Sequence, residues 1–334
     1  MTASAHNARQ VAVADIGGTH ARFAIAHMEG GTVRSLDHMV KLRASDHPSL
    51  QTAWEQYRRD CGCDLPSDGA FAVAAPVRGP VGEEVIYFTN SSWMLRRAQV
   101  ADKLGLERFT LVNDFGAVCH SVDQMGRDEL AHICGPDIGL PEEGAITVIG
   151  PGTGLGVSYV TRTKHGATVF ESEGGHIDFA PIDEVEDRIL HSLRREHQRV
   201  SLERVVSGHG LQVIYRILCE IEEAEPRQLD DRDLWSLALG GTDAIANAAL
   251  DRYCLCLGSA AGDFVLSHGA KAIVIAGGLG QRIGERLNTS GFRERMAFKG
   301  RFSTLMEATP AYRTVQAEPG LTGAAVAFAK EHLQ

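Results

Sequence analysis

The sequence lacks the long apolar segment that a membrane-spanning protein needs. No uninterrupted apolar run approaches the roughly 20 residues that cross a bilayer. The first ten residues also lack the apolar core of a signal peptide, and we expect them to be a flexible lead-in. No low-complexity linker interrupts the 334 residues. These features predict a globular protein that has no membrane partner.

An excess of basic residues is missing as well. The 33 lysines and arginines are outnumbered by 43 aspartates and glutamates, which gives a formal net charge of −10. A nucleic-acid surface needs a basic patch, so we expect no nucleic-acid partner. The same charge balance allows a nucleotide ligand, because backbone amides and a metal ion neutralise phosphates without many lysines.

Cysteines at zinc-site spacing are also lacking. The chain has seven cysteines, an odd number that favours reduced thiols and a cytoplasmic location. One residue separates the members of each close pair, Cys61-Gly62-Cys63 and Cys254-Leu255-Cys256, whereas zinc ligands are usually separated by about two to four residues. The second pair lies in an expected helix, where residues two apart point to different faces. We interpret both pairs as buried or incidental thiols.

The most informative feature that is present is a glycine turn between two apolar runs, Val11–Ala14 and Phe23–Ala26. The turn reads Asp15-Ile16-Gly17-Gly18-Thr19 and predicts two strands that fold back on each other. Its glycines allow positive φ and a close approach of backbone N–H groups to a ligand. Asp15 adds a carboxylate suited to Mg²⁺ or to a water on Mg²⁺. The segment therefore favours a nucleotide site, with an ordinary hairpin as the alternative.

A second glycine hairpin follows the same plan. The expected strand Ala145–Ile149 leads into a turn at Gly150–Gly156, and the chain returns through Val157–Val160. Two such hairpins that face one another could bind the two ends of a polyphosphate, but only the first has an aspartate for a metal. A P-loop would need a lysine after its glycines, and a dinucleotide fingerprint would need a helix there. Neither pattern is found in these turns.

Polar residues at the ends of expected strands are further candidates. Asn113-Asp114 follows the strand Phe109–Val112, a common place for a ligand site, although Asp114 could instead cap the next helix. Glu173-Gly174-Gly175-His176 predicts a tight loop whose carboxylate and imidazole suit the hydroxyls of a polyol. A surface turn is the alternative for this loop.

Two other segments have weaker local signals. Glu203 follows Ser201, and the local interpretation is an acidic residue that stabilises a helix dipole. Gly277-Gly278 comes after the expected strand Lys271–Ile275, and this turn could lie close to a flat ring such as adenine.

The remaining pattern alternates strands and helices. A buried strand is expected over 70–74, ending at Pro76, and a short helix is expected to start at Ser91-Ser92 before Trp93-Met94-Leu95. The last helix is too apolar to be a free tail, so we expect it to pack on the first domain. The other predicted helices cover 47–59, 98–104, 115–118, 183–197, 211–223, 232–238, 244–267 and 322–333.

Taken together, these segments resemble the bacterial glucokinases of the hexokinase–actin–Hsp70 ATPase superfamily. His20 departs from the family pattern, in which many relatives have asparagine, but its ring can donate a similar hydrogen bond. The cysteine-rich zinc motif of the repressor–kinase branch is absent. The stretches that carry the resemblance occur in the family order over nearly the whole chain: Ala14–Arg22, Leu111–Phe115, Gly152–Gly156, Glu173–Pro181, Glu203–Gly208, Ile275–Gly278 and Pro319–Leu321.

The resemblance implies a two-domain, actin-like (ribonuclease-H-like) α/β fold with a central cleft and mixed sheets flanked by helices. It places a small domain at 1–124 plus 317–334 and a large one at 125–316. The implied reaction is ATP-dependent phosphorylation of D-glucose at its 6-hydroxyl. A kinase for another hexose or amino sugar is an alternative, and a non-catalytic sugar sensor is an alternative from another class.

The resemblance also implies residue roles. Asp15 would hold Mg²⁺ directly or through water, and Asp114 would be the general base. Glucose would be bound by Asn113, Asp114, Glu173, His176 and Glu203. ATP would be bound by Ala14, Asp15, Ile16, Gly17, Gly18, Thr19, Gly152, Thr153, Gly154, Gly277 and Gly278. For a cytoplasmic enzyme of this size we expect a homodimer.

Overall fold

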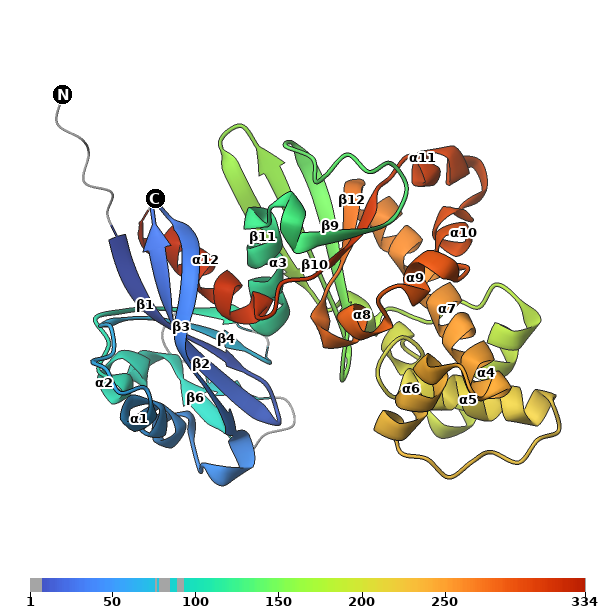
Figure 1. The fold of residues 1–334 in the computed structure, drawn as a ribbon, viewed down its shortest axis with the longest axis horizontal. Coiled ribbons are helices and arrows are strands. Elements are labelled where there is room, and N and C mark those ends of the chain that lie inside the picture. The colour runs from blue at the N-terminus through green and yellow to red at the C-terminus, as the bar shows by residue number, and fades with distance from the viewer. Residues whose placement is uncertain (1–7, 76, 78–84, 89–92, 334) are drawn as a thin grey trace. The chain divides into compact units, whose positions relative to one another are not determined.

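A computed structural model describes residues 8–75, 77, 85–88 and 93–333. It divides into two compact units, each with its own sheet and helices: unit 1 contains Met1–Met125 and Gln316–Gln334, and unit 2 contains Gly126–Val315 (Figure 1). The predicted mixed α/β class is confirmed, because both sheets combine parallel and antiparallel pairs. None of the described helices is long and apolar enough to cross a membrane.

Unit 1 contains a five-stranded sheet in the order β3-β2-β1-β4-β7. The first three strands pair antiparallel, and β4 and β7 run parallel to β1. The predicted hairpin and the two later strands are confirmed, whereas β3 lacks an apolar run and was not predicted. The strands are β1 (Ala8–Ile16), β2 (His20–Glu29), β3 (Thr32–Arg43), β4 (Asp68–Val73) and β7 (Arg108–Asn113).

Helices cover both faces of this sheet, which explains the continuous apolar run in β1. Ala12 and Ala14 belong to the cluster that includes Trp54 of α1 (Leu50–Asp60), and Val11 and Val13 belong to the cluster of α12 (Pro319–His332). Two further helices are α2 (Val100–Leu104) and α3 (Asp114–Gln124). The α12 helix, red in Figure 1, packs on α3 and on this sheet, as predicted.

The structure differs from two local predictions in unit 1. α1 begins at Leu50 rather than at residue 47, because Ser49 forms a capping box with Thr52. Met94 and Leu95 belong to a strand, β6 (Met94–Arg96), paired with β5 (Val85–Tyr87), so the helix predicted there is wrong. The expected helix start at residues 91–92 and the expected strand end at residue 76 lie outside the described residues.

Unit 2 contains a six-stranded sheet in the order β11-β10-β9-β12-β13-β8. β12 runs parallel to β9, and β10 runs antiparallel to β9. β9 continues through Gly150 and Pro151, so the second glycine turn is shorter than expected. The strands are β8 (Leu130–Cys134), β9 (Gly144–Pro151), β10 (Leu155–Thr163), β11 (Gly166–Ser172), β12 (Ala270–Ile275) and β13 (Ala311–Thr314).

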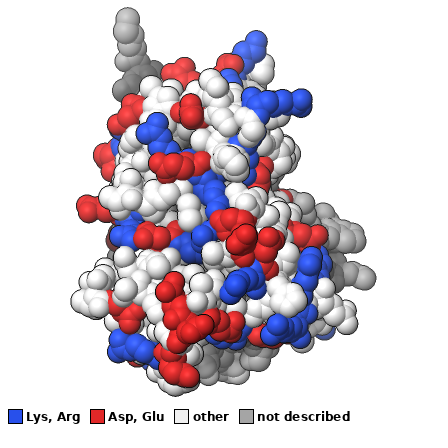
Figure 2. All heavy atoms as spheres, turned by 90° about the vertical axis from the view of Figure 1, so that its right-hand side faces the viewer, with Lys and Arg blue, Asp and Glu red and all other residues white. Residues whose placement is uncertain are grey.

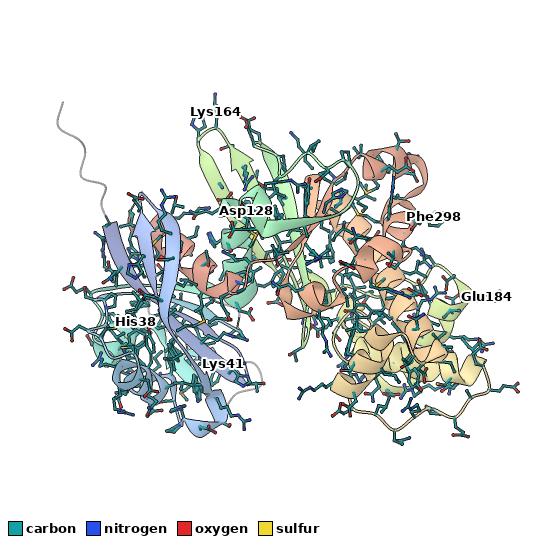
Figure 3. The ribbon with its side chains drawn as sticks, viewed as in Figure 1. His38, Lys41, Asp128, Lys164, Glu184 and Phe298 are labelled. Carbon is teal, nitrogen blue, oxygen red and sulfur yellow. The ribbon has the colours of Figure 1, made fainter. Side chains whose placement is uncertain are left out.

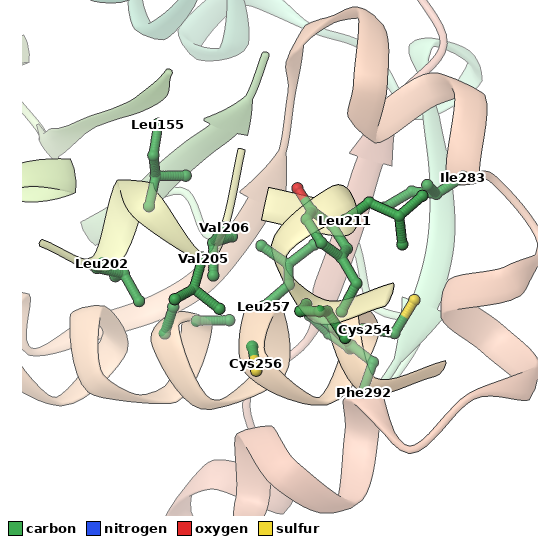
Figure 4. Packing of buried hydrophobic residues seen from close by; sticks show 14 of the residues in the cluster. Leu155, Leu202, Val205, Val206, Leu211, Cys254, Cys256, Leu257, Ile283 and Phe292 are labelled. Atoms are coloured by element: carbon green, nitrogen blue, oxygen red, sulfur yellow. The ribbon is translucent and has the colours of Figure 1, made fainter. Parts of the chain in front are cut away.

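A long helix, α7 (Ala244–His268), organises the core of unit 2. It packs against α5, α6 and α10, and its Leu257 belongs to one cluster with Leu211 and Phe292 (Figure 4).

Acidic and basic side chains are interspersed on the face drawn in Figure 2. The other helices are α4 (Glu184–Glu196), α5 (Gly210–Ile221), α6 (Asp231–Gly240), α8 (Gly277–Ile283), α9 (Arg286–Thr289), α10 (Phe292–Ala297) and α11 (Ser303–Glu307). Short 3₁₀ turns include η4 (Gly174–His176) and η5 (Leu202–Arg204).

Candidate active site

The first glycine turn joins β1 to β2 in unit 1. The Gly17 N–H donates to the His20 carbonyl at 3.0 Å, and the Thr19 carbonyl accepts from the Ala44 N–H at 3.0 Å. The glycines of this turn allow a positive φ, but neither Gly17 nor Gly18 has one. What glycine provides at this position is therefore a backbone without a side chain over it.

Asp15 lies beside this turn, at the end of β1. Its Oδ2 accepts from the guanidinium of Arg22 at 3.1 Å, and the Nε of Arg22 lies 3.5 Å from Oε2 of Glu318. Burial raises the pKa of Asp15, and Arg22 opposes that rise. Gly320 lies against the same carboxylate, since a Cβ there would be 3.0 Å from Cγ of Asp15. The sequence motifs included Arg22 and Gly320 but did not indicate that they contact Asp15.

Asn113 and Asp114 begin α3 at the end of β7. Asn113 is the N-cap: its Oδ1 accepts from the N–H groups of Phe115 and Gly116, each at 3.0 Å, and its Nδ2 donates to the Ala75 carbonyl. The alternative in which Asp114 caps the helix is therefore wrong. Asp114 is the first residue of α3, half-buried, and its Oδ1 accepts from the Phe115 N–H at 2.8 Å. Its carboxylate therefore lies at the positive end of the α3 dipole.

The parallel pairing in unit 1 brings the two aspartates to one sheet edge. Ile16 pairs with Val73, and Val73 pairs with Asn113, so β1, β4 and β7 end together. Because neighbouring strands are about 4.8 Å apart, the ends of β1 and β7 are separated by about 10 Å, with β4 between them. The carboxyl ends of parallel strands are a common place for ligand sites.

The second glycine turn, in unit 2, presents bare backbone. The Gly152 N–H donates to the Gly154 carbonyl at 2.8 Å, and the Gly152 carbonyl accepts from the Gly208 N–H at 2.7 Å. Thr153 is exposed, and no described atom lies within 4 Å of an ideal Cβ position on Gly152. A ligand can therefore approach this backbone closely.

Glu203 is held against that turn rather than acting only in its own helix. Its Oε2 accepts from the Leu155 N–H at 2.9 Å, and a Cβ on Gly154 would lie 2.3 Å from the same oxygen. Its own element is the three-residue turn η5, and Ser201 makes no side-chain capping hydrogen bond. The local interpretation of Glu203 as a helix-dipole residue is incomplete, because the contact with Leu155 spans 48 positions.

The Glu173–His176 loop packs on the same strand. Gly175 is buried, and a Cβ there would lie 2.1 Å from the Leu155 carbonyl oxygen, so only glycine fits. The side chains of Glu173 and His176 are exposed. The Leu202 N–H donates to the Ile177 carbonyl at 2.7 Å, which joins η4 to η5. Leu155 therefore contacts two candidate elements: its carbonyl oxygen lies against Gly175 of the loop, and its N–H donates to Glu203.

Gly277 and Gly278 lie beside the end of β9. The Ala276 N–H donates to the Ile149 carbonyl at 2.8 Å, and a Cβ on Gly277 would lie 3.3 Å from the Pro151 carbonyl oxygen. Gly277 has φ +80°, which favours glycine, and Gly278 is exposed. The candidate residues of unit 2 therefore gather at one edge of its sheet.

Neither a cluster of metal ligands nor the cavity along α4 and α5 marks the candidate site within the described residues. No three or more His, Cys, Asp or Glu side chains within the described ranges are grouped to hold a metal ion. A magnesium ion that is shared with phosphates needs only one or two carboxylates, which Asp15 can supply. A cavity of about 520 Å³ along α4 and α5 contains none of the candidate residues, so it does not mark this site.

The chain is similar to known proteins over nearly all of its length. A family model described as Glucokinase matches residues 12–331. A glucokinase of Zymomonas mobilis is 49% identical over 97% of this chain and 98% of its own length. The crystal structure of a glucokinase from an Antarctic psychrotroph has a TM-score of 0.83 at 31% identity and covers 96% of this chain and 99% of that one. The crystal structure of a glucokinase from Balamuthia mandrillaris in complex with glucose has a TM-score of 0.78 at 20% identity. The match covers 97% of this chain and 95% of that one.

Proposed function

The chain belongs to the glucokinase family, and we propose that it phosphorylates the 6-hydroxyl of D-glucose with ATP, using Asp114 as the general base. The observation that carries this assignment is the position of Asp114, which is half-buried at the carboxyl end of β7 and on the first turn of α3. Phosphoryl transfer depends mainly on alignment and charge stabilisation, with one carboxylate to accept the proton of the attacking hydroxyl.

The local contacts of Asp114 support the role of base. The Phe115 N–H donates to its Oδ1, and the α3 dipole stabilises the carboxylate. Asn113 fixes the start of the helix, so the carboxylate is presented from a rigid element. The base would take the proton from the 6-hydroxyl as the oxygen attacks the terminal phosphorus of ATP.

The two glycine turns would bind the phosphates of ATP through backbone N–H groups. The proposed phosphate-binding residues are Ala14, Asp15, Ile16, Gly17, Gly18 and Thr19 in unit 1 and Gly152, Thr153 and Gly154 in unit 2. Gly277 and Gly278 would line the adenosine. Asp15 would hold Mg²⁺, directly or through water, and the ion would neutralise phosphate charge. Arg22 keeps the Asp15 carboxylate oriented and favours its ionised form.

Glucose would be bound by Asn113, Asp114, Glu173, His176 and Glu203. Carboxylates, an amide and an imidazole supply the acceptors and donors that a ring of hydroxyls requires. A sugar that leaves one of these groups unpaired binds less well, which is the basis for selectivity. A panel of hexoses and amino sugars, compared by kcat/KM, tests glucose against its epimers.

The biological setting is part of the same proposal. We place the enzyme in the cytoplasm, at the entry of glucose into glycolysis, and as a homodimer. The seven cysteines are free thiols, which is consistent with a reducing compartment. Sedimentation of the purified chain measures the oligomeric state, and a monomer at all concentrations contradicts the dimer.

The experiment that tests the reaction is a coupled assay for glucose 6-phosphate with Mg-ATP and glucose. We expect Asp114→Asn to lower kcat by about 10²–10⁴-fold while glucose still binds. Asp102→Asn is the matched control, because Asp102 is an exposed acidic residue in the first turn of another helix of unit 1. Full activity of Asp114→Asn would reject the base but keep the kinase, and an inactive, folded parent would reject the kinase.

A further inference from the structure

Two thiols lie in contact just after α1. The Sγ atoms of Cys61 and Cys63 are 3.5 Å apart, and the Sγ of Cys61 also donates to the Cys63 carbonyl at 3.2 Å. Gly62, between them, has φ +67°, with no described atom within 4 Å of an ideal Cβ position. The backbone conformation, rather than a lack of space, therefore favours glycine here, and it turns both side chains toward each other.

The neighbouring strand β3 constrains this turn. His38 lies on β3 (labelled in Figure 3), has a positive φ of 47°, and its Nδ1 is 2.9 Å from the Cys61 carbonyl. Burial, the Cys61 thiol and the carboxylates of Asp37 and Asp64 raise the pKa of Cys63. These surroundings disfavour a thiolate, but they place no such cost on a neutral disulfide.

The exposure of the cysteines distinguishes this pair. Of the seven cysteines, all of which lie within the described residues, only Cys63 is not buried. Cys254 and Cys256 have the same spacing, but they lie within α7, where residues two apart point to different faces. Burial raises the pKa of Cys254 to about 12. Cys254 and Cys256 are therefore a control within the same chain, because they have the spacing of Cys61 and Cys63 but lie in a helix.

We propose that Cys61 and Cys63 form a reversible dithiol–disulfide site whose oxidant is a low-molecular-weight disulfide such as oxidised glutathione. Cys63, the more accessible of the two, first loses its thiol proton and then attacks one sulfur of the oxidant, which forms a mixed disulfide and releases one glutathione thiolate. The Cys61 thiol then loses its proton and attacks the Cys63 sulfur, which releases the second glutathione. The protein loses two electrons and two protons, and these leave on two glutathione thiols.

The test uses the full chain under native conditions. The protein is incubated with mixtures of reduced and oxidised glutathione, quenched with acid, alkylated and analysed by mass spectrometry. We expect the loss of two alkylatable thiols per chain, a mass decrease of two hydrogen atoms, and a disulfide that maps to Cys61–Cys63. Excess reduced glutathione should restore both thiols. Cys254 and Cys256 should stay reduced in the same sample.

Single variants separate the site from general oxidation. Cys61→Ser should stop at glutathione on Cys63, and Cys63→Ser should show no disulfide, with circular dichroism to confirm that both fold. Three results for the parent overturn the proposal: glutathione retained on Cys63, a disulfide between two chains, or a Cys61–Cys63 disulfide that forms only in urea. Because the parent alone can give these results, the test does not depend on the variants.

Discussion

Glu203 illustrates how a single side chain is oriented at the candidate site. Its carboxylate accepts a charge-assisted hydrogen bond from the Leu155 N–H at 2.9 Å. Gly154 makes room for it, since any side chain there would meet the same oxygen. Asp15 is held in a comparable way by Arg22, with Gly320 against it. At this scale, a charged group is positioned by a partner and by a glycine that leaves space.

The space beside Glu203 gives a prediction. In Gly154→Ala, the new Cβ would lie 2.3 Å from the Glu203 carboxylate, so this side chain has to move while the backbone is unaffected. We expect kcat/KM for glucose to fall at least about tenfold, which is about 1.4 kcal/mol of transition-state binding. Steady-state kinetics and a thermal melt measure this. Unchanged kinetics in a folded variant would contradict a role of Glu203 in glucose binding.

His120, on α3, gives a prediction about pH. Burial lowers its pKa to about 4, with a further decrease from Lys330, and its Nδ1 has no hydrogen-bond partner among the described residues. The neutral ring is favoured in the folded state, so this contribution to stability is complete above about pH 6.5 and is lost as the pH falls toward about 4. The loss is about 3 kcal/mol in the free energy of unfolding.

Urea unfolding between about pH 7 and pH 4 measures this effect. His120→Gln cannot bind the proton, so its stability should fall less steeply with decreasing pH than that of the parent. Parallel curves for the two proteins would show that His120 is not responsible for the dependence.

At the scale of elements, the 3₁₀ turn η4 approaches β10 because it contains two glycines. A Cβ on Gly174 would lie 2.9 Å from Cγ1 of Val157, and a Cβ on Gly175 would meet the Leu155 carbonyl oxygen. The turn therefore places Glu173 and His176 by backbone contact with a strand. The sequence predicted a tight loop here, but the strand that it packs against could not be derived from the local pattern.

Gly175→Ala tests this packing. The new methyl group would lie 2.1 Å from a backbone oxygen that cannot move easily, so η4 has to shift away from β10. We expect a loss of about 1–3 kcal/mol in unfolding free energy and a weaker affinity for glucose. Denaturant unfolding and calorimetric glucose titration measure the two effects. Gly240→Ala is the control, because Gly240 ends α6 and no described atom lies within 4 Å of its Cβ position. This variant should keep the unfolding free energy and the glucose affinity of the parent.

At the scale of the molecule, the last segment of the chain completes the unit that its first segment begins. α12 packs on β1, β4 and α3, and most of its residues are buried. The helices approach so closely that a Cβ on Gly323 would lie 1.6 Å from the Ala117 carbonyl oxygen. Because α3 begins with Asp114, the position of this residue depends on the C-terminal helix.

Gly323→Ala should therefore destabilise unit 1 in particular. Both helices have to separate to accommodate the methyl group, and we expect a loss of about 3 kcal/mol. Hydrogen exchange followed by mass spectrometry measures each unit separately: protection should fall in β1, β4 and α3 and stay unchanged in β9 and β12. Equal loss of protection in both units, or none, would contradict the local effect.

The sequence by itself determined the mixed α/β class, the two glycine hairpins, most helices and the family. Alternating apolar runs, glycine turns and helix caps act through neighbouring residues, so these features can be read from short segments. Two predictions were wrong at single segments. The helix predicted from residue 47 begins at Leu50 because Ser49 is its cap, and Met94 and Leu95 form a strand because β5 pairs with them. The assigned roles of the site residues stay predictions.

Only the tertiary structure decided which distant groups meet. Arg22 contacts both Asp15 and Glu318, the Leu155 N–H donates to Glu203, and His38 contacts the Cys61 carbonyl. These contacts depend on strand register, on the close approach that glycines allow and on a left-handed residue at position 62. The contacts of Glu318 and Glu203 join segments far apart in the chain and form only after separate elements have packed, whereas Cys61 and Cys63 meet through the local turn at Gly62.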